Sequence, residues 1–330
     1  MSRIPAQRVG WGLLAAIALL SAAAPVIAPN DVARQFADLG YAPPMPPRIV
    51  DAEGRWHAPF VYPLRLVDRL QRRYVEDRTT RVPLRWFSAG ALVSTENPNV
   101  PWLPLGGDAL GRDVLARVLL GARLSLGVAV VAVAGALCIG ALIGAVAGFF
   151  GGRLDDGLMR VSDFVLVLPA IYVVLALRAS MPLVLSTAQV FWTVALVLAL
   201  AGWPYPARGV RAVIAGERRK EYAEAARAAG AGRVRILLRH LLPATRSFLL
   251  LQATLLLPAF ILAEATLSYV GLGFMEPVPS WGVMLREAAG IGALSEAPWL
   301  LAPAGAIVIT VFAVHLCAGK ASENRYPMLT

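Results

Sequence analysis

Charged residues are scarce in this chain: Lys, Arg, Asp and Glu make up 16% of its 330 residues, whereas 58% are hydrophobic. A soluble protein needs more charge than this to cover its surface, so the composition excludes an ordinary soluble domain. A helix of about 20 apolar residues crosses the hydrocarbon core of a bilayer. The clearest such stretch, Leu124 to Gly152, contains no charged residue. We therefore expect an integral membrane protein.

Cysteine and histidine are also rare, with two and three copies. Cys138 and Cys317 both lie inside apolar runs, and their spacing indicates neither a disulfide framework nor a metal site. A Gly-x4-Gly-Lys-Ser/Thr phosphate loop is missing too, because the single Gly-Lys pair, Gly319-Lys320, is followed by Ala321. We predict no catalytic residue, metal or cofactor in this chain, which should not hydrolyse ATP.

Positive charge is concentrated in one segment. The net charge of the chain is +10, and residues 208–246 hold ten Lys or Arg against three acids. A short basic loop between apolar spans is typical of the cytoplasmic side of a membrane protein. This location accounts for the charge without nucleic acid, which we do not expect as a partner.

The apolar stretches predict an all-α integral membrane protein with six transmembrane helices, at about residues 9–28, 124–150, 158–177, 183–203, 247–270 and 298–319. Arg178 should end the third span by reaching toward the membrane surface. A cleaved signal peptide is the alternative for the first stretch, because Val26-Ile27-Ala28 resembles a cleavage site, but the stretch is longer than the apolar core of such peptides. Six spans from a cytoplasmic N-terminus place the basic segment and the C-terminus in the cytoplasm as well.

Four parts follow from this pattern. Residues 1–29 form the cytoplasmic N-terminus and first span, 30–112 an extracytoplasmic insertion, 113–320 a core with five spans, and 321–330 a cytoplasmic tail. Ten prolines from Pro43 to Pro104 set the insertion apart. Its aromatic residues favour a small folded cap, because they can bury enough area to order it. These aromatic residues are Trp56, Phe60, Tyr62, Tyr74, Trp86 and Phe87.

Three glycines in the second predicted span repeat at four-residue spacing. Gly140, Gly144 and Gly148 therefore share one face of a helix. Small residues on such a face let the backbone of another helix approach closely. We expect this face to pack against another helix.

A short helix is predicted from Glu221 to Ala229, because it consists of strong helix formers with acids near its start. Gly230 is placed to be the residue that follows the helix end. Most of its side chains are methyl groups, so the helix can enter a groove of another protein. A helix lying on the membrane is the alternative, but only Tyr222 is large and apolar enough to enter the acyl region.

This segment resembles the cytoplasmic loop of ABC importer permeases. That loop has Glu-Ala-Ala, three residues, Gly, nine residues and a tetrad ending in Leu-Pro. Here Glu224-Ala225-Ala226, Gly230 and His240-Leu241-Leu242-Pro243 stand at the same spacing. His in place of Ile at the start of the tetrad is typical of the oligopeptide/dipeptide/nickel branch.

Three further segments resemble the same branch, namely residues 105–115, 261–268 and 279–282. Gly107 stands where Thr is usual, the 30–100 insertion is larger than in many members, and the chain end lacks the common acidic Gly-Asp ending. These departures concern the solute and the tail rather than the class of transporter.

The resemblance implies a type I ABC importer membrane domain in the cytoplasmic (inner) membrane of a bacterium or archaeon, surrounded by membrane lipid. It implies a homologous permease, two ATP-binding subunits that carry ATP and Mg²⁺, and an extracytoplasmic solute-binding protein, for import of peptides or peptide-like solutes. The insertion then either caps the pore mouth or contacts the binding protein. The residues expected to couple the chain to the ATPases are Glu221, Tyr222, Glu224, Ala225, Ala226, Gly230, His240, Leu242 and Pro243.

Glu264 is a carboxylate deep in the fifth predicted span. Because exposure to lipid is costly, it either lines the translocation path, with Ser268 one turn away, or pairs with a polar group on a neighbouring helix. An alternative function is a proton-coupled secondary transporter with Glu264 and His315 as a relay, but no inverted repeat or pair of broken spans indicates one. A membrane anchor for the insertion is another alternative, although an anchor does not need a methyl-rich docking helix.

Overall fold

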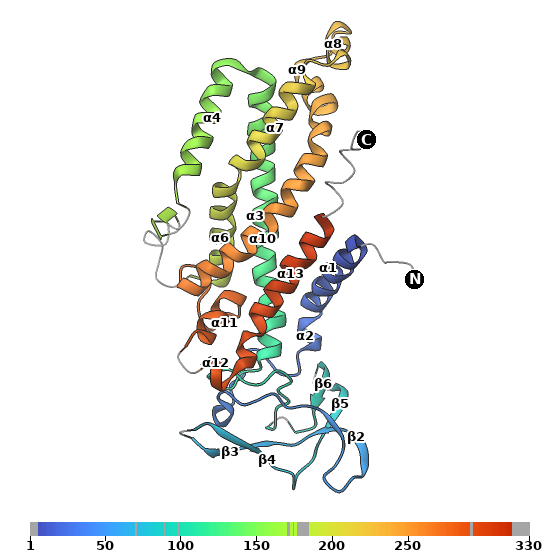
Figure 1. Ribbon diagram of the computed structural model, residues 1–330, viewed down its shortest axis with the longest axis vertical. Coiled ribbons are helices and arrows are strands. Elements are labelled where there is room, and N and C mark those ends of the chain that lie inside the picture. The colour runs from blue at the N-terminus through green and yellow to red at the C-terminus, as the bar shows by residue number, and fades with distance from the viewer. Residues whose placement is uncertain are drawn as a thin grey trace, which may run out of the picture. The chain divides into compact units, whose positions relative to one another are not determined.

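The computed structural model describes residues 6–69, 71–88, 90–97, 99–169, 172–173, 175–176, 185–290 and 293–318. The predictions for Arg178 and for the tail 321–330 fall outside these residues. The chain divides into two compact units: the first comprises Met1–Trp11, Gly127–Glu264 and Phe312–Thr330, and the second Gly12–Leu126 and Ala265–Val311. Four helices contribute to both units (Figure 1), namely α1 (Ala6–Ala22), α3 (Val114–Phe150), α10 (Arg246–Val270) and α13 (Ala302–Ala318).

Three described helices are long and apolar enough to cross a membrane, at Val114–Phe150, Arg233–Val270 and Pro298–Cys317. A fourth candidate among the described residues is the pair α6 (Thr187–Gly202) and α7 (Pro204–Glu217), which is bent by 43°. Helix α1 is apolar but shorter, with 17 residues. The protein is thus mostly helical with three or four candidate spans. These candidates lie at the positions predicted for the second, fourth, fifth and sixth spans. A total of six stays a prediction.

Two helix boundaries differ from the prediction. Helix α3 runs without interruption for 37 residues from Val114, so it begins well before residue 124, where the second span was predicted to start. The predicted fourth span does not give way to a loop at Trp203, because α7 continues the chain as a helix to Glu217. Pro204 stands in the first turn of α7, where a missing N–H removes no helical hydrogen bond.

The glycine face of α3 packs against α7 within the first unit, as predicted. A Cβ atom added to Gly144 would lie 2.3 Å from the carbonyl oxygen of Ala207, and one added to Gly148 would lie 2.6 Å from that of Arg211. Such distances leave no room for any side chain. Arg211 also binds Asp155 of α4 (Gly152–Val167) through two hydrogen bonds of 2.5 and 2.6 Å.

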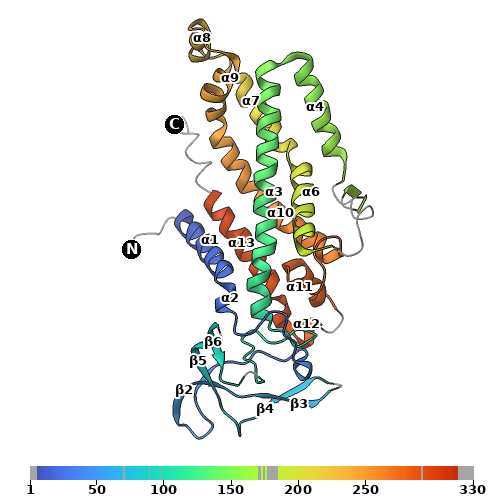
Figure 2. The same ribbon diagram turned by 180° about the vertical axis from the view of Figure 1, so that it is seen from behind.

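The second unit contains strands, so the all-α prediction is wrong for the insertion. A four-stranded sheet has the order β1-β2-β5-β6, and β3 pairs with β4; every pair is antiparallel (Figure 2). Short strands interrupted by proline give a weak sequence pattern, because they depend on pairing between distant residues. The strands are β1 (Arg48–Val50), β2 (Trp56–Val61), β3 (Leu64–Asp68), β4 (Arg73–Glu76), β5 (Val82–Ser88) and β6 (Ala91–Thr95).

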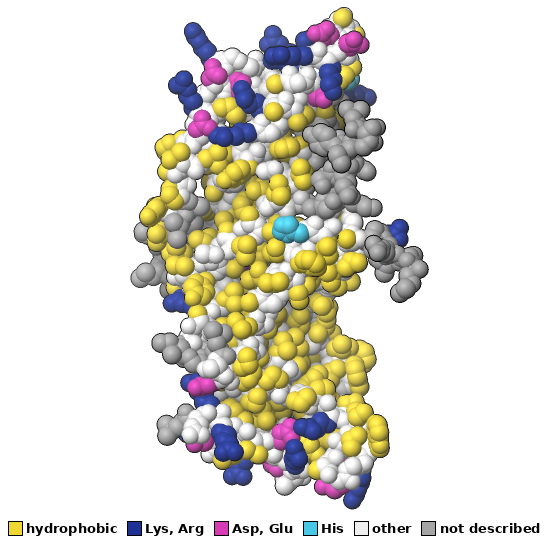
Figure 3. Space-filling model, viewed as in Figure 1, with side chains coloured by type: hydrophobic (Ala, Val, Ile, Leu, Met, Phe, Trp, Pro, Cys, Tyr) yellow, Lys and Arg dark blue, Asp and Glu magenta, His cyan; other side chains and the backbone are white. Residues whose placement is uncertain are grey.

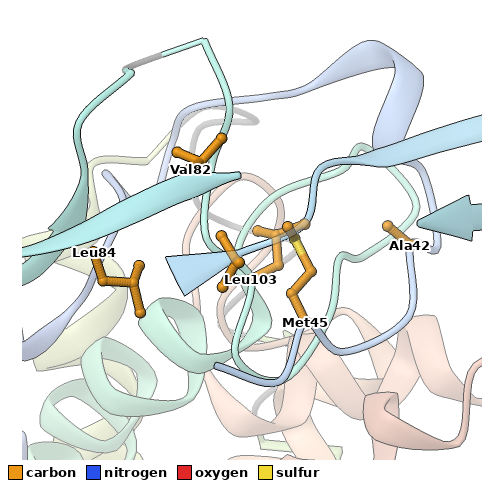
Figure 4. Close-up of a cluster of buried hydrophobic side chains, with 6 residues drawn as sticks. Ala42, Met45, Val82, Leu84 and Leu103 are labelled. Carbon is orange, nitrogen blue, oxygen red and sulfur yellow. The ribbon is translucent and has the colours of Figure 1, made fainter. Parts of the chain in front are cut away.

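The insertion has a hydrophobic core of its own, formed by Ala42, Met45, Val61, Val82, Leu84 and Leu103 (Figure 4). The predicted aromatic packing is confirmed for Phe60 and Tyr62, which are buried with their ring centroids 5.1 Å apart. It is wrong for Trp56, Trp86 and Phe87, which are largely exposed. Aliphatic side chains from β2, β5 and the flanking loops therefore order this insertion.

Short helical elements complete the described residues. In the first unit they are α8 (Glu221–Ala228), α9 (Arg233–Ile236), the π-helical turn η2 (Leu237–Leu241) and the 3-10 turn η3 (Leu242–Thr245). In the second unit they are α2 (Ala24–Ile27), η1 (Ala37–Leu39), α11 (Trp281–Ala288), α12 (Ala293–Glu296) and η4 (Pro298–Leu301).

Candidate functional site

The helix predicted from Glu221 to Ala229 is present as α8, which ends one residue earlier at Ala228, and its docking role stays a prediction. Lys220 precedes it in an extended conformation, and Glu221 and Glu224 lie in its first turn, where negative charge suits the helix dipole. Gly230 has a φ of +78°, and its N–H donates to the carbonyl of Arg227 over 3.0 Å. The N–H of Ala231 donates to the carbonyl of Ala226 over 3.0 Å, which completes a Schellman cap.

One face of α8 anchors the helix to its own chain. Ala223 is fully buried in a cluster with Val210, Ile214, Ile236 and Leu241, and Ala226 packs at its edge. Ala226, predicted as a coupling residue, therefore contributes to this anchor. Ala223 was not singled out from the sequence. The signal that identifies it is its spacing of three from Ala226, which puts both methyl groups on one face.

The opposite face of α8 is open to solvent. Glu221, Ala225 and Ala228 are exposed on it, with Tyr222 at its side. The Tyr222 hydroxyl donates a hydrogen bond to the carboxylate of Glu217 over 2.7 Å. Partial burial is the main reason that the pKa of Tyr222 rises to about 12, and this hydrogen bond is the second. A hydrogen bond from Lys220, supported by the one from Tyr222, lowers the pKa of Glu217. The exposed face thus carries the methyl groups of Ala225 and Ala228 and the carboxylate of Glu221, with a fixed tyrosine at its side.

The second half of the predicted motif packs on the same cluster as α8. Leu241 is fully buried in it, Leu242 and His240 are partly buried, and Pro243 is exposed in the first turn of η3. The residues between Gly230 and this tetrad form α9 and the first part of η2. They return the chain to the cluster in which Ala223 of α8 is buried. Of the tetrad, Leu241 was not predicted as a site residue.

A groove of about 620 Å³ lies beside α8 in the first unit. Arg218 forms one side of it by donating to the carbonyl of Phe149 over 2.5 Å, near the end of α3. Arg227 of α8 donates to the carbonyl of Arg218 over 2.7 Å. Figure 3 shows Lys, Arg, Asp and Glu gathered at the end of this unit that carries α8 and α9, while hydrophobic side chains cover the long helices. The lining residues are Phe149, Phe150, Arg218, Arg219, Glu224, Arg227, Ala231, Arg233 and Ile236.

The two predicted path residues are both buried in α10. Glu264 belongs to the first unit and Ser268 to the second, and neither side chain is accessible to solvent beyond 1%. The hydroxyl of Ser268 accepts a hydrogen bond of 3.1 Å from the N–H of Phe274. Ser268 therefore fixes the turn that follows α10 and also lines a cavity of about 800 Å³ in the second unit.

That cavity borders a network of ion pairs that was not predicted from the sequence. Arg112 binds Asp108 over 2.6 Å and Glu276 over 2.6 Å, and Arg117 binds Glu276 over 2.8 Å. Burial acts to raise the pKa of Glu276, but the hydrogen bond from Arg112 and the charge of Arg117 outweigh it and lower the pKa. Asp108 and Arg112 stand four residues apart in the 105–115 motif, which was the available signal. Asp108, Arg112 and Arg117 are buried, whereas Glu276 is half exposed. Removing Asp108, the buried acid of the set, should cost about 3–5 kcal/mol.

Metal ligands are not grouped in the part of the chain that the structure describes. No set of three or more His, Cys, Asp or Glu side chains lies close enough there to hold a metal ion.

Long apolar helices that pack through glycines, together with a short exposed helix in a charged segment at one end, are features of a helical membrane protein. The model of one protein family, described as binding-protein-dependent transport system inner membrane component, matches residues 140–325. The match covers more than half of the chain and includes α6 to α10 with the whole charged segment.

Three relatives extend this match. The oligopeptide transport system permease protein OppC of Bacillus subtilis (strain 168) is 35% identical over 244 residues, which is 74% of this chain and 77% of that protein. The dipeptide transport system permease protein DppC of the same organism is 38% identical over 226 residues, 68% of each chain. The di/tripeptide transport system permease protein DppC of Pseudomonas aeruginosa (strain UCBPP-PA14) is 36% identical over 227 residues, 68% of this chain and 72% of that protein. The chain belongs to this family of inner-membrane components, among the ABC importer permeases of the oligopeptide/dipeptide kind.

Proposed function

We propose that this chain is one of two homologous permease subunits that form the translocation path of an ATP-driven importer of peptides or peptide-like solutes. The relatives named for oligopeptide, dipeptide and tripeptide transport support this cargo. The observation that carries the proposal is helix α8, an exposed and methyl-rich helix held at the end of the first unit by a Schellman cap and by Ala223.

The family to which the chain belongs supports the rest of the complex. Two separate ATPase subunits would bind ATP and Mg²⁺ and dock on the α8 helices of the two permeases, and a solute-binding protein would deliver the cargo from outside. The chain would have six spans, with both termini and the basic segment in the cytoplasm and residues 30–112 outside. Closure of the ATPases would move α8 as a rigid lever, because its buried face joins it to α7, α9 and η2.

The coupling role predicts that α8 variants lose the ATPase while the chain stays in the membrane. Gly230→Val forces a β-branched residue into a φ of +78° and should open the cap, a local cost of about 1–2 kcal/mol. Glu224→Lys should reverse a charge at the border of the exposed face. We expect both variants to lose co-purification with the ATPase subunits while membrane insertion remains intact.

Gly232 supplies the matched control. It has a φ of −65°, which any residue adopts, and a Cβ atom added to it meets nothing within 4 Å. Gly232→Val should therefore retain the ATPase. If the Gly230 and Glu224 variants co-purify with the ATPase as well as the parent protein does, the coupling role of α8 is refuted.

The path-lining role of Glu264 and Ser268 is tested by separating transport from assembly. Glu264→Gln keeps the shape of the side chain and removes its charge, and Ser268→Ala removes the hydroxyl. If these groups line the path, solute uptake into cells or proteoliposomes should fall several-fold while the amount of assembled complex stays constant. The reverse order, with assembly lost first, would indicate a purely structural role.

A further inference from the structure

The groove beside α8 combines two kinds of lining that are seldom found together. Phe149 and Phe150 end the candidate span α3, and their rings meet edge to face with centroids 5.2 Å apart. The side chains of Arg218, Arg219, Arg227 and Arg233 line the rest, against one acid, Glu224. The groove therefore lies where an apolar span ends and a strongly positive surface begins.

Two of the four arginines already have structural partners. Arg218 donates to the carbonyl of Phe149 at the negative end of α3, and Arg227 donates to the carbonyl of Arg218. Within the described part of the chain, the guanidinium groups of Arg219 and Arg233 make no hydrogen bond or ion pair, and both residues are exposed. Arg219 and Arg233 thus offer bidentate donors to an anion, and the other two fix the shape of the groove.

The groove is separate from the centre of the α8 face proposed for the ATPase, although Glu224 lines the groove and also borders that face. On a helix with about 100° between successive residues, Glu224 and Arg227 lie roughly a quarter of a turn from the buried Ala223 and Ala226. They lie about as far, in the other direction, from the exposed face centred on Glu221, Ala225 and Ala228. A partner bound to the exposed face would therefore not cover the groove, which lies between α8 and other residues of the first unit.

We propose that this groove binds the headgroup of an anionic phospholipid. A phosphodiester, which carries one negative charge, would accept hydrogen bonds from the guanidinium groups of Arg219 and Arg233, and the acyl chains would leave along Phe149 and Phe150 into the bilayer. Basic pockets beside transmembrane helices at the membrane boundary are suited to anionic headgroups. The volume of about 620 Å³ accommodates a phosphate with its glycerol group. The lipid would hold the N-terminal end of α8 at the membrane surface. This role goes beyond the proposed transport function and does not depend on the cargo.

The test measures lipid retention by the full-length chain, purified in mild detergent and titrated with phosphatidylglycerol or with phosphatidylcholine, using native mass spectrometry. The parent protein should retain phosphatidylglycerol in preference to phosphatidylcholine. The double variant Arg219→Gln/Arg233→Gln should lower the affinity for phosphatidylglycerol on the order of ten- to thirty-fold, because each arginine near an anionic lipid contributes appreciably to binding. Retention of phosphatidylcholine should not change.

Matched variants separate the groove from general surface charge. Arg235 and Arg239 are exposed in the same segment but do not line the groove, so Arg235→Gln/Arg239→Gln removes the same charge and should retain phosphatidylglycerol within about twofold of the parent. Arg219→Lys/Arg233→Lys, which keeps the charge, should retain part of the binding. An unchanged midpoint of thermal unfolding for the Gln pair would show that it is folded.

Three results would overturn the proposal. Equal losses in the two Gln pairs would show a diffuse charge effect without a site. Competition by glycerol phosphate at the same concentration as the lipid would show a soluble anion site. Loss of the ATPase from the Arg219/Arg233 variant, with lipid retention unchanged, would assign the groove to the ATPase. The last result leaves the role of the exposed face of α8 intact, so the two proposals fail separately.

Discussion

Asp113 combines complete burial with several hydrogen bonds at the start of α3. Its carboxylate accepts from the N–H groups of Leu115 and Ala116, over 2.9 and 3.3 Å, and so acts as the N-cap. Asn30 donates to the same carboxylate over 2.9 Å. Burial outweighs these hydrogen bonds, and the nearby charge of Asp108 acts in the same direction, so the pKa of Asp113 rises to about 6.

This shift predicts a pH dependence of stability. Because the folded pKa lies above the ordinary value of 3.8, the folded state binds the proton more tightly. The stability that the protonated group contributes is complete below pH 3.8 and is lost as the pH rises through 6. Asp113→Asn keeps one oxygen to accept the cap hydrogen bonds, gives up the acceptor for Asn30 as the protonated carboxyl group does, and removes this titration. At pH 7.5 the variant should be more stable by about 2–3 kcal/mol, and at pH 4 equally stable.

Thermal unfolding in detergent at the two pH values checks this prediction. Asp77 is a matched control, since it also accepts a local backbone hydrogen bond but is only half-buried, and its pKa is lowered chiefly by the hydroxyl of Thr79. Asp77→Asn should give no gain in stability at pH 7.5. A gain for Asp113→Asn of the same size at pH 4 and pH 7.5 would show that titration is not its cause.

Single residues were predictable where local chemistry decides their role. Gly230 follows from the pattern of a helix end, because a residue with positive φ is needed there and only glycine adopts it without strain. Ala223 and Leu241 were missed since their burial depends on Val210 and Ile214 of α7, which the sequence presents as part of a charged loop. Glu276 was missed for a similar reason, as it stands more than 150 residues from Arg117.

The seam between α3 and α7 is the element whose packing the sequence predicts most directly. Gly144 faces the carbonyl oxygen of Ala207, and an added Cβ would lie 2.3 Å from it. Gly144→Ala should therefore separate the two helices and destabilise the first unit by about 1–3 kcal/mol, the usual cost of overpacking. The expected readout is a lower midpoint of thermal unfolding in detergent.

Gly157 in α4 provides the comparison for this seam. An added Cβ meets nothing within 4 Å there, and the residue lies in the interior of its helix. Gly157→Ala should be neutral or stabilise the protein by up to about 1 kcal/mol, since alanine favours the helix. Equal destabilisation by both substitutions would contradict the seam, because glycine flexibility rather than close packing would then explain the result.

Elements were harder to predict where packing overrides the local pattern. Helix α7 contains two prolines and two arginines, which favour a loop, yet its buried residues Val210 and Ile214 hold it against α3. The strands of the insertion depend on partners such as Val61 and Val82, whose pairing no local signal indicates. Apolar helices α10 and α13, by contrast, follow from hydropathy alone, and their predicted bounds agree with the structure within a few residues.

At the scale of the whole molecule, the distribution of charge predicts the orientation in the membrane. The segment 208–246 gathers basic residues at one end of the first unit (Figure 3). The positive-inside rule predicts that this end lies in the cytoplasm. An even number of spans then places both termini on the same side, and an odd number would separate them. Orientation is therefore the property that connects the span count to the proposed docking of an ATPase on α8.

Labelling of single cysteines tests this orientation. In a background with Cys138→Ala and Cys317→Ala, we introduce Ala52→Cys in the exposed turn before β2 and Ala244→Cys in the exposed part of η3. A membrane-impermeant maleimide should label Cys at 52 in intact cells whose outer envelope admits it, and Cys at 244 only after the membrane is opened. A permeant maleimide should label both at once, which shows that each thiol is reactive. Labelling of position 244 from outside would place α8 on the side of the membrane away from a cytoplasmic ATPase, and would overturn both the coupling role and the six-span topology. Failure to label position 52 alone would overturn only the predicted location of the insertion.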